Sequence, residues 1–386
     1  MISFPQGFHG IAVSAGLKSS GDLDLTLIVN SGSIKYGTAV FTDNRIEAAP
    51  VTWSREAVRD HQVAAVLLNS GGANACTGPV GFSHVHKSAE MVANHLNISA
   101  SDVAICSTGL IGVQLPENKL FPALEKLLLE MKDGSILSSV ENVARAIMTT
   151  DSVPKISSST KGDLRTVGIA KGAGMLAPGL ATMLSVIMTD GIVDTKTADE
   201  IFKKVSQSTF NRIDSDGCMS TNDTVLFLAS GKSGVAVNDE ELEIMLTSIC
   251  QDLAYQLISD AEGHSKVVHI RTIGAASESD AVTIGRSCAR NNLLKCAING
   301  EDPNWGRILA AIGTTNAIFD PYAIDVSING IKVCHQSAPG EPIEQVDMKN
   351  KIVELLIDLK SGPHEATIYT NDLSAAYVHE NSSYST

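Results

Sequence analysis

The stretch KGAGMLAPGLATMLSVIMTDG, residues 171–191, lies near the middle of the 386-residue chain. It begins with a glycine-rich turn that contains a proline, passes from Ala181 to Thr182, and ends in an apolar run that is typical of a buried strand. An abrupt, flexible entry directly before a threonine has three interpretations, which differ in fold and in chemistry.

The first interpretation is a dinucleotide-binding turn, because Gly172, Gly174 and Ala177 fit the pattern G-x-G-x-x-[GA] after a predicted strand. In that fold the helix begins near the second glycine, so Pro178 would lie inside it, where a missing N–H costs about 3 kcal/mol. The residues after Ala181 also favour a strand over a helix. Both points argue against a dinucleotide site.

The second interpretation is a structural turn that feeds a buried strand, as most glycine-rich turns do. The third is a self-processing site that exposes Thr182 as a new N-terminus. The glycines leave the carbonyl of Ala181 free to twist, and the Thr182 hydroxyl is one short ring away, so intramolecular attack has a high effective molarity. The dipeptide does not decide the matter, because Ala366 and Thr367 repeat it without the glycine and proline entry.

Composition narrows the class of protein. The chain is 44% hydrophobic and 19% charged with a net charge of −14, and it has no long basic run, so neither nucleic acid nor an anionic membrane is an expected partner. No secretory signal or membrane-spanning run is found, and seven cysteines without a C-x-x-C spacing favour a reducing compartment, which predicts a cytoplasmic protein. His84 and His86 have no third ligand nearby, so no metal site is expected.

Apolar, β-branched runs predict strands over 23–30, 63–69, 102–107, 164–170, 183–189, 224–230 and 267–273. Amphipathic periodicity predicts helices over 117–132, 138–147, 196–210, 239–260, 279–291 and 346–359. Strands and helices do not alternate strictly, and turns such as that at residues 30–32 indicate hairpins. The pattern favours an α+β sandwich with mixed or antiparallel sheets. No domain boundary is readable.

Seven motifs together resemble one family, the ornithine acetyltransferases, also called glutamate N-acetyltransferases, of arginine biosynthesis. They are LNSGGANACTG (68–78), CSTGLIG (106–112), AIMTTD (146–151), KGAGMLAPGLATML (171–184), DAEG (260–263), DPNWGR (302–307) and ENSSYST (380–386). The resemblance covers essentially the whole chain. It implies a four-layered α/β/β/α sandwich core with an additional smaller α/β domain. It also implies self-cleavage after Ala181 into an alpha chain (1–181) and a beta chain (182–386), which stay together as an α2β2 assembly.

The same resemblance assigns roles to residues. Cleavage would give Thr182 both a nucleophilic hydroxyl and a free α-amine, whose reference pKa of about 7.7–8.0 suits a general base. Thr108 and Gly109 would form the oxyanion hole through a hydroxyl and a backbone N–H, although these two residues by themselves indicate only a turn after a strand. The expected substrate-binding residues are Thr149, Lys171, Thr182, Glu262, Asn381 and Thr386.

The implied reaction is acetyl transfer from N2-acetyl-L-ornithine to L-glutamate by a ping-pong mechanism through an acetyl-Thr182 intermediate. No cofactor is implied, and acetyl-CoA remains open as a second acetyl donor. Two other classes are kept as alternatives: a self-processed hydrolase, against which Thr in place of Ser at 182 argues, and a scaffold without activity. A measurement of whether glutamate outcompetes water as the acetyl acceptor distinguishes a transferase from a hydrolase. An activity assay on the purified protein distinguishes an enzyme from a scaffold.

Overall fold

The two apolar runs on either side of the glycine-rich turn form neighbouring strands. In the computed structural model, which describes residues 2–132, 137–177 and 183–383, β7 (Leu164–Lys171) and β8 (Leu184–Thr189) pair antiparallel with Lys171 opposite Leu184. They belong to a five-stranded sheet in the order β3-β9-β8-β7-β6. Its other strands are β3 (Tyr36–Phe41), β6 (Lys155–Lys161) and β9 (Thr224–Ala229), and β8 and β9 run parallel. We call this the second sheet.

The first sheet has four strands in the order β1-β2-β4-β5. They are β1 (Phe8–Val13), β2 (Leu25–Asn30), β4 (Ala65–Asn69) and β5 (Val103–Ser107), with β4 and β5 parallel. Alternate side chains point to opposite faces of a strand. Thus Val66 and Leu68 pack against the second sheet, while Leu67 packs against helices on the outer face. The apolar faces of the two sheets therefore share one core.

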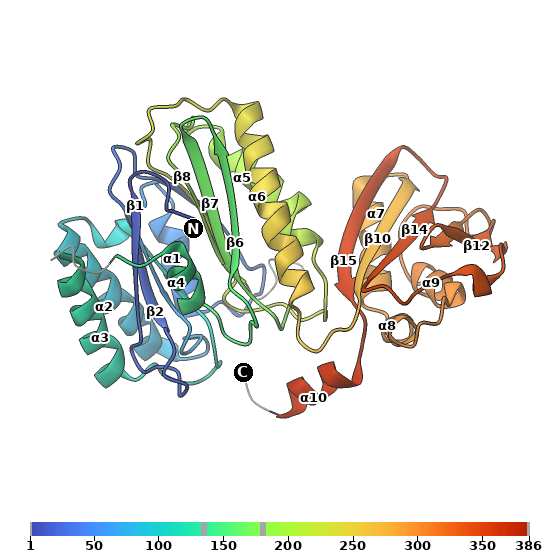
Figure 1. The fold of residues 1–386 in the computed structure, drawn as a ribbon, viewed down its shortest axis with the longest axis horizontal. Helices are drawn as coiled ribbons and strands as arrows, with labels where there is room; N and C mark the ends of the chain where they lie inside the picture. The colour runs from blue at the N-terminus through green and yellow to red at the C-terminus, as the bar shows by residue number, and fades with distance from the viewer. Residues whose placement is uncertain (1, 133–136, 178–182, 384–386) are drawn as a thin grey trace.

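Helices cover both outer faces of this sandwich. On the first sheet lie α1 (Ala49–Ala57), α2 (Gly78–Leu96) and α3 (Glu117–Lys132), and on the second lie α5 (Ala198–Ser208) and α6 (Asp239–Ser259) (Figure 1). The short helix α4 (Val140–Ala146) adds Val140, Val143 and Ala144 to the core between the sheets. The layers follow the order α/β/β/α, so the predicted four-layered core is confirmed.

The C-terminal third of the chain forms the predicted smaller α/β unit. Its mixed sheet, β13-β12-β11-β14-β10-β15, consists of β10 (Val267–Ala275), β11 (Asp325–Ile328), β12 (Ile331–His335), β13 (Ala338–Pro339), β14 (Ile352–Asp358) and β15 (His364–Asn371). One apolar core joins this sheet to α7 (Glu278–Ala289), α8 (Asn292–Asn299) and α9 (Trp305–Ile312). The last helix, α10 (Ala375–Ser383), leaves the unit and runs back toward the sandwich (Figure 1).

Side-chain caps mark the first residues of two long helices. The α6 helix begins where the Asn238 side chain accepts a hydrogen bond from the Glu241 N–H, and its first turn carries three acidic residues that favour the positive end of the helix dipole. The Ser277 side chain caps α7 in the same way. Within the described part of the chain, no helix is both long enough and apolar enough to cross a membrane.

Two predictions are wrong. In place of the helix predicted over 346–359, Ile352–Asp358 form strand β14, because Val353, Leu355 and Ile357 alternate with more exposed neighbours and the strand is enclosed between β10 and β11. The turn at residues 30–32 does not close a hairpin, because β2 lies in the first sheet and β3 in the second. In both cases the pairing between distant segments decides the outcome.

Candidate functional site

Six of the expected site residues line one cavity at the end of the sandwich. They are Thr108, Gly109, Thr149, Lys171, Glu262 and Asn381, and the wall is completed by Ala73, Ile111, Thr150, Gly174, Met175, Ser220, Thr221 and Asn222. These residues come from both sheets, from the turn after α6 and from α10. Ala181, Thr182 and Thr386 lie outside the described residues.

The turn after β5 brings Thr108 and Gly109 to the cavity. Gly109 has a φ of +129°, and a Cβ atom at this position would lie 2.8 Å from the backbone nitrogen of Gly72, so only glycine fits. The turn is held by hydrogen bonds from the Gly72 N–H to the Thr108 carbonyl (3.0 Å) and from the Ala73 N–H to the Leu110 carbonyl (3.0 Å). Between described residues, no backbone hydrogen bond uses the Gly109 N–H. That donor is therefore available to a ligand.

Asn222 fastens the two loops of the first sheet to the second sheet. Its buried amide donates to the Ala73 carbonyl (2.6 Å) and to the Ser107 carbonyl (2.8 Å). One side chain, two residues before β9, therefore holds both the loop after β4 and the end of β5, which leads into the turn at Gly109. The sequence gives no signal for this role, because an asparagine before a strand is an ordinary turn residue.

Lys171 ends β7 with only 2% of its surface exposed. Its Nζ donates to Thr108 Oγ1 across a distance of 3.2 Å, which leaves the Thr108 hydroxyl hydrogen free to act as a donor. Burial lowers the pKa of Lys171, and Asp151, Asp223 and Glu262 oppose this effect. The result is a desolvated cation beside a donor hydroxyl.

Glu262 also lines the cavity and is 9% exposed. Thr150 Oγ1 donates to Glu262 Oε1 (2.6 Å), and the Glu262 N–H donates to the Ala173 carbonyl (3.0 Å). Gly174 completes this wall, because a Cβ atom there would lie within 2.7 Å of both carboxylate oxygens. The cavity is thus lined by the amine of a lysine and by the carboxylate of a glutamate.

Helix α10 reaches the cavity through a close backbone contact at Gly263. A Cβ atom on Gly263, which has a φ of +59°, would lie 2.2 Å from the Tyr377 nitrogen. The Ser374 hydroxyl also donates to the Gly263 carbonyl. Docked in this way, α10 carries Asn381, which is exposed at its far end, to the cavity wall. Of the described residues in the C-terminal motif 380–386, Asn381 lines the cavity.

A second buried acid lies beside the segment that follows Thr182. Asp223 Oδ1 accepts a hydrogen bond from the Met183 N–H (3.0 Å), and Asp223 Oδ2 has no hydrogen-bond partner among the described residues. Burial raises the pKa of Asp223 well above its usual range, although the Met183 N–H and Lys171 favour the charged form. Burial therefore favours the neutral form of this carboxyl group.

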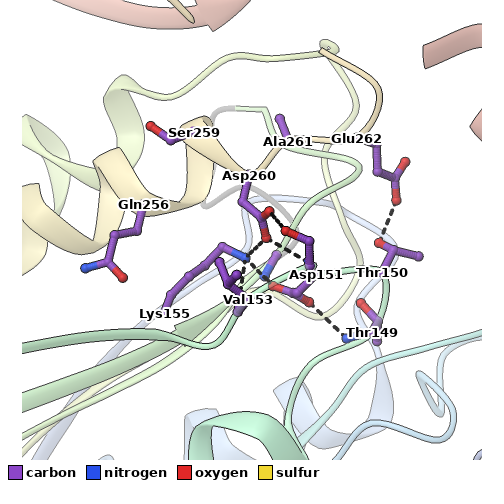
Figure 2. Close-up of polar contacts among 12 residues, drawn as sticks. Thr149, Thr150, Asp151, Val153, Lys155, Gln256, Ser259, Asp260, Ala261 and Glu262 are labelled. Carbon is purple, nitrogen blue, oxygen red and sulfur yellow. Dashed lines mark hydrogen bonds and ion pairs between the residues drawn. The ribbon is translucent and has the colours of Figure 1, made fainter. Parts of the chain in front are cut away.

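A network of ion pairs underlies the cavity wall. Figure 2 shows Asp151, Lys155 and Asp260 together, beside Thr149, Thr150 and Glu262. Sequence reasoning missed all three, although Asp151 stands inside the quoted motif AIMTTD. Its position directly after two threonines of the site was the one signal that could have pointed to it.

A further cavity adjoins the first one at Glu262. It lies where the sandwich, the C-terminal unit and α10 meet, and its lining includes Asp216, Lys295 and Tyr377. Lys295 is 5% exposed, and its Nζ donates to the Ser215 carbonyl and to Thr370 Oγ1 (3.1 Å). Burial lowers the pKa of Lys295 to about 8, although nearby carboxylates favour its charged form.

The arrangement suits chemistry on a carbonyl group. The Thr108 hydroxyl and the Gly109 backbone line the same cavity as the ionisable side chains of Lys171 and Glu262, and hydroxyl and backbone N–H groups are the donors that stabilise an oxyanion in acyl transfer. In the described part of the chain, no group of three or more His, Cys, Asp or Glu side chains is arranged to hold a metal ion. His84 instead pairs with Glu117 (2.8 Å) and His86 with Glu90 (3.7 Å).

Comparison with known proteins places the whole chain in one group of relatives. A family model described as the ArgJ family matches residues 10–386. A protein named arginine biosynthesis bifunctional protein ArgJ from Streptomyces avermitilis is 52% identical over 384 residues, which are 100% of this chain and 99% of the relative. The protein of the same name from Thermobifida fusca is 49% identical over 386 residues, with 100% of both chains covered.

Among solved structures, the ornithine acetyltransferase of Mycobacterium tuberculosis in complex with ornithine is 40% identical in sequence. The match covers 47% of this chain and 94% of that chain, with a TM-score of 0.40.

Proposed function

The chain belongs to the ArgJ family, and from this premise we propose that it transfers an acetyl group from N2-acetyl-L-ornithine to L-glutamate in arginine biosynthesis. The supporting observation is the convergence of Thr108, Gly109, Lys171 and Glu262 on one cavity, with Lys171 bonded to Thr108. These groups suit the two parts of the reaction, because an acyl carbonyl needs oxyanion donors and an amino-acid substrate needs partners for its charges.

The nucleophile in this proposal is Thr182, freed by self-cleavage after Ala181. Its hydroxyl attacks the acetyl carbonyl while its α-amine accepts the hydroxyl proton, and the Thr108 hydroxyl and Gly109 N–H stabilise the tetrahedral oxyanion. Collapse of this intermediate breaks the C–N bond, and the amine of ornithine takes the proton as it leaves. The acetyl group remains on Thr182 as an ester.

Glutamate completes the cycle on the same atom. Its amine attacks the ester carbonyl, the Thr182 oxygen leaves and recovers a proton, and N-acetylglutamate is released. Lys171 binds the α-carboxylate of each substrate, and Glu262, Thr149, Asn381 and Thr386 bind the remaining polar groups. Acetyl-CoA could replace acetylornithine as donor, since a thioester carbonyl needs the same oxyanion donors. No cofactor takes part, and the two chains form an α2β2 assembly.

Mass spectrometry of the enzyme tests this mechanism. Incubation with acetylornithine alone should add the mass of one acetyl group to the chain that begins with Thr182, and glutamate should remove it. Double-reciprocal plots at several glutamate concentrations should be parallel. Intersecting plots without an acetylated chain would show direct transfer in a ternary complex. If water removes the acetyl group as fast as glutamate does, the protein is a hydrolase.

A further inference from the structure

The buried side chain of Lys155 forms ion pairs with two carboxylates, Asp151 and Asp260, beside the cavity wall. Its Nζ lies 2.6 Å from Asp151 Oδ1 and 2.6 Å from Asp260 Oδ2, and the Lys155 side chain has no exposed surface (Figure 2). Asp151 is equally enclosed, whereas 12% of the Asp260 side chain is exposed. Buried charges need partners of this kind, since each loses several kcal/mol of hydration. Removal of either carboxylate would therefore leave part of this buried charge without a partner.

Only Asp151 extends from this network to the site. Its Oδ1 also accepts a hydrogen bond from the Gly172 N–H (2.6 Å), and its Oδ2 accepts one from the Thr149 N–H (2.9 Å). Asp260, by contrast, accepts from the N–H (3.0 Å) and the hydroxyl of Ser152. One carboxylate thus holds Thr149 directly and Lys171 through the residue that follows it.

The charges that face Lys171 come from four segments. Asp151 from the loop before β6, Asp223 from the start of β9 and Glu262 from the turn after α6 favour its protonated form, and Asp151 is the strongest of the three. Lys155 on β6 opposes them. Burial raises the pKa of Asp223, which favours its neutral form. Asp151 keeps its charge, because Lys171 and Lys155 outweigh the effect of its burial and lower its pKa.

We propose that Asp151 is a positioning residue that keeps Lys171 in place and protonated, so that Lys171 can bind the carboxylate of the substrate. Lys155 in turn fixes Asp151. The inference rests on the proposed function, because it assigns the source of the charge on which substrate binding depends. It adds a residue that does not line the cavity and that, besides its ion pair with Lys155, accepts hydrogen bonds from the backbone N–H groups of Thr149 and Gly172.

The test compares Asp151→Asn with Asp260→Asn, each of which removes one carboxylate from Lys155 and preserves the size of the side chain. Thermal unfolding and completeness of chain cleavage are measured first, and both variants should lose stability. The KM for acetylornithine and kcat are then measured from pH 6 to 9. Asp151→Asn should raise KM by about tenfold or more, the effect expected from weakening one charged hydrogen bond, with a smaller change in kcat.

The dependence of KM on pH separates a role of Asp151 in positioning Lys171 from a role in protein stability alone. Substrate binding needs protonated Lys171, so KM rises with pH as Lys171 loses its proton, and without the Asp151 charge this rise should begin at lower pH. Asp260→Asn should keep the wild-type pH course. An equal KM and pH course in the two variants would overturn the inference, whereas a wild-type protein without acetyl transfer would overturn the proposed function instead.

A second pair of variants tests the inference if Asp151→Asn or Asp260→Asn does not fold. Asp151→Glu and Asp260→Glu retain the charge but lengthen the side chain. Asp151→Glu should raise KM several-fold at every pH while keeping the wild-type pH course, and Asp260→Glu should leave KM close to the wild-type value. No difference in KM between these two variants would also overturn the inference.

Discussion

Lys171 Nζ donates a hydrogen bond of 3.2 Å to Thr108 Oγ1, and this bond joins the two sheets of the sandwich at the candidate site. Thr108 follows β5 of the first sheet, and Lys171 ends β7 of the second. The proposed oxyanion donor and the proposed carboxylate-binding group therefore hold one another in position. Any relative shift of the sheets would disturb both.

Thr108→Ala should lower kcat by about 100- to 1,000-fold, because the hydroxyl acts on charge that develops in the transition state. Thr108→Ser keeps the hydroxyl and should retain most of the activity. Steady-state kinetics on fully cleaved protein measure both, since loss of the hydroxyl could also slow self-cleavage. A Thr108→Ala variant with normal kcat would remove Thr108 from the oxyanion hole.

Thr182→Ala should remain a single chain after purification, while the wild-type protein separates into two chains of about half its length. The physical reason is that alanine has no hydroxyl to attack the preceding carbonyl. Denaturing electrophoresis measures the cleavage, and N-terminal sequencing should place Thr182 first in the second chain. A wild-type protein that is intact and fully active would contradict a nucleophile freed by cleavage.

Asn222→Ala should lower both stability and kcat. Two buried carbonyls, those of Ala73 and Ser107, lose their donor, which costs about 1–3 kcal/mol of unfolding free energy. The turn that carries Gly109 also loses its attachment to the second sheet, so the oxyanion donors are less well placed. Thermal unfolding and kcat measure the two effects. A destabilised variant with normal kcat would show that the two hydrogen bonds of Asn222 serve stability only.

Gly263→Ala should raise KM, because a methyl group 2.2 Å from the Tyr377 nitrogen must displace α10 and with it Asn381. Gly162→Ala is a matched control, since Gly162 has the same φ of +59° but no atom within 4 Å of the added methyl group. Both variants should lose about 1 kcal/mol of stability through backbone strain, and only Gly263→Ala should change the KM for acetylornithine. Equal KM values would exclude α10 from substrate binding.

Lys295 should make the stability of the protein rise with pH in mildly alkaline solution. Its pKa of about 8 lies below the reference value of about 10.4, so between these values the unfolded chain binds more protons than the native protein. Relative to Lys295→Met, the unfolding free energy of the wild type should therefore increase by on the order of 1–3 kcal/mol from pH 7 to pH 10. Denaturant unfolding across this range measures the difference.

Lys126→Met is the control for that experiment, because the Lys126 side chain is 75% exposed. The difference between this variant and the wild type should stay constant with pH. A pH-independent difference for Lys295→Met as well would show that Lys295 is hydrated in solution.

The sequence by itself determined several helices and strands. Apolar, β-branched runs predicted β7 and β8, and amphipathic periodicity predicted α6 and α7, because each of these signals is contained within one segment. Short motifs also identified Thr108, Lys171 and Glu262 as candidates, since each stands in a distinctive pattern of neighbours. The structure brings these three residues to one cavity.

Only the tertiary structure decided which partners these residues have. A helix was predicted over residues 346–359, yet Ile352–Asp358 form β14 because two neighbouring strands satisfy their backbone groups. The roles of Asn222 and Asp151 were equally hidden, because each depends on contacts between segments that are remote in sequence. Lys155 and Asp260, for example, are 105 residues apart and meet at 2.6 Å. Hydrogen bonds and ion pairs act over a few ångströms of space, so the folded arrangement alone selects them.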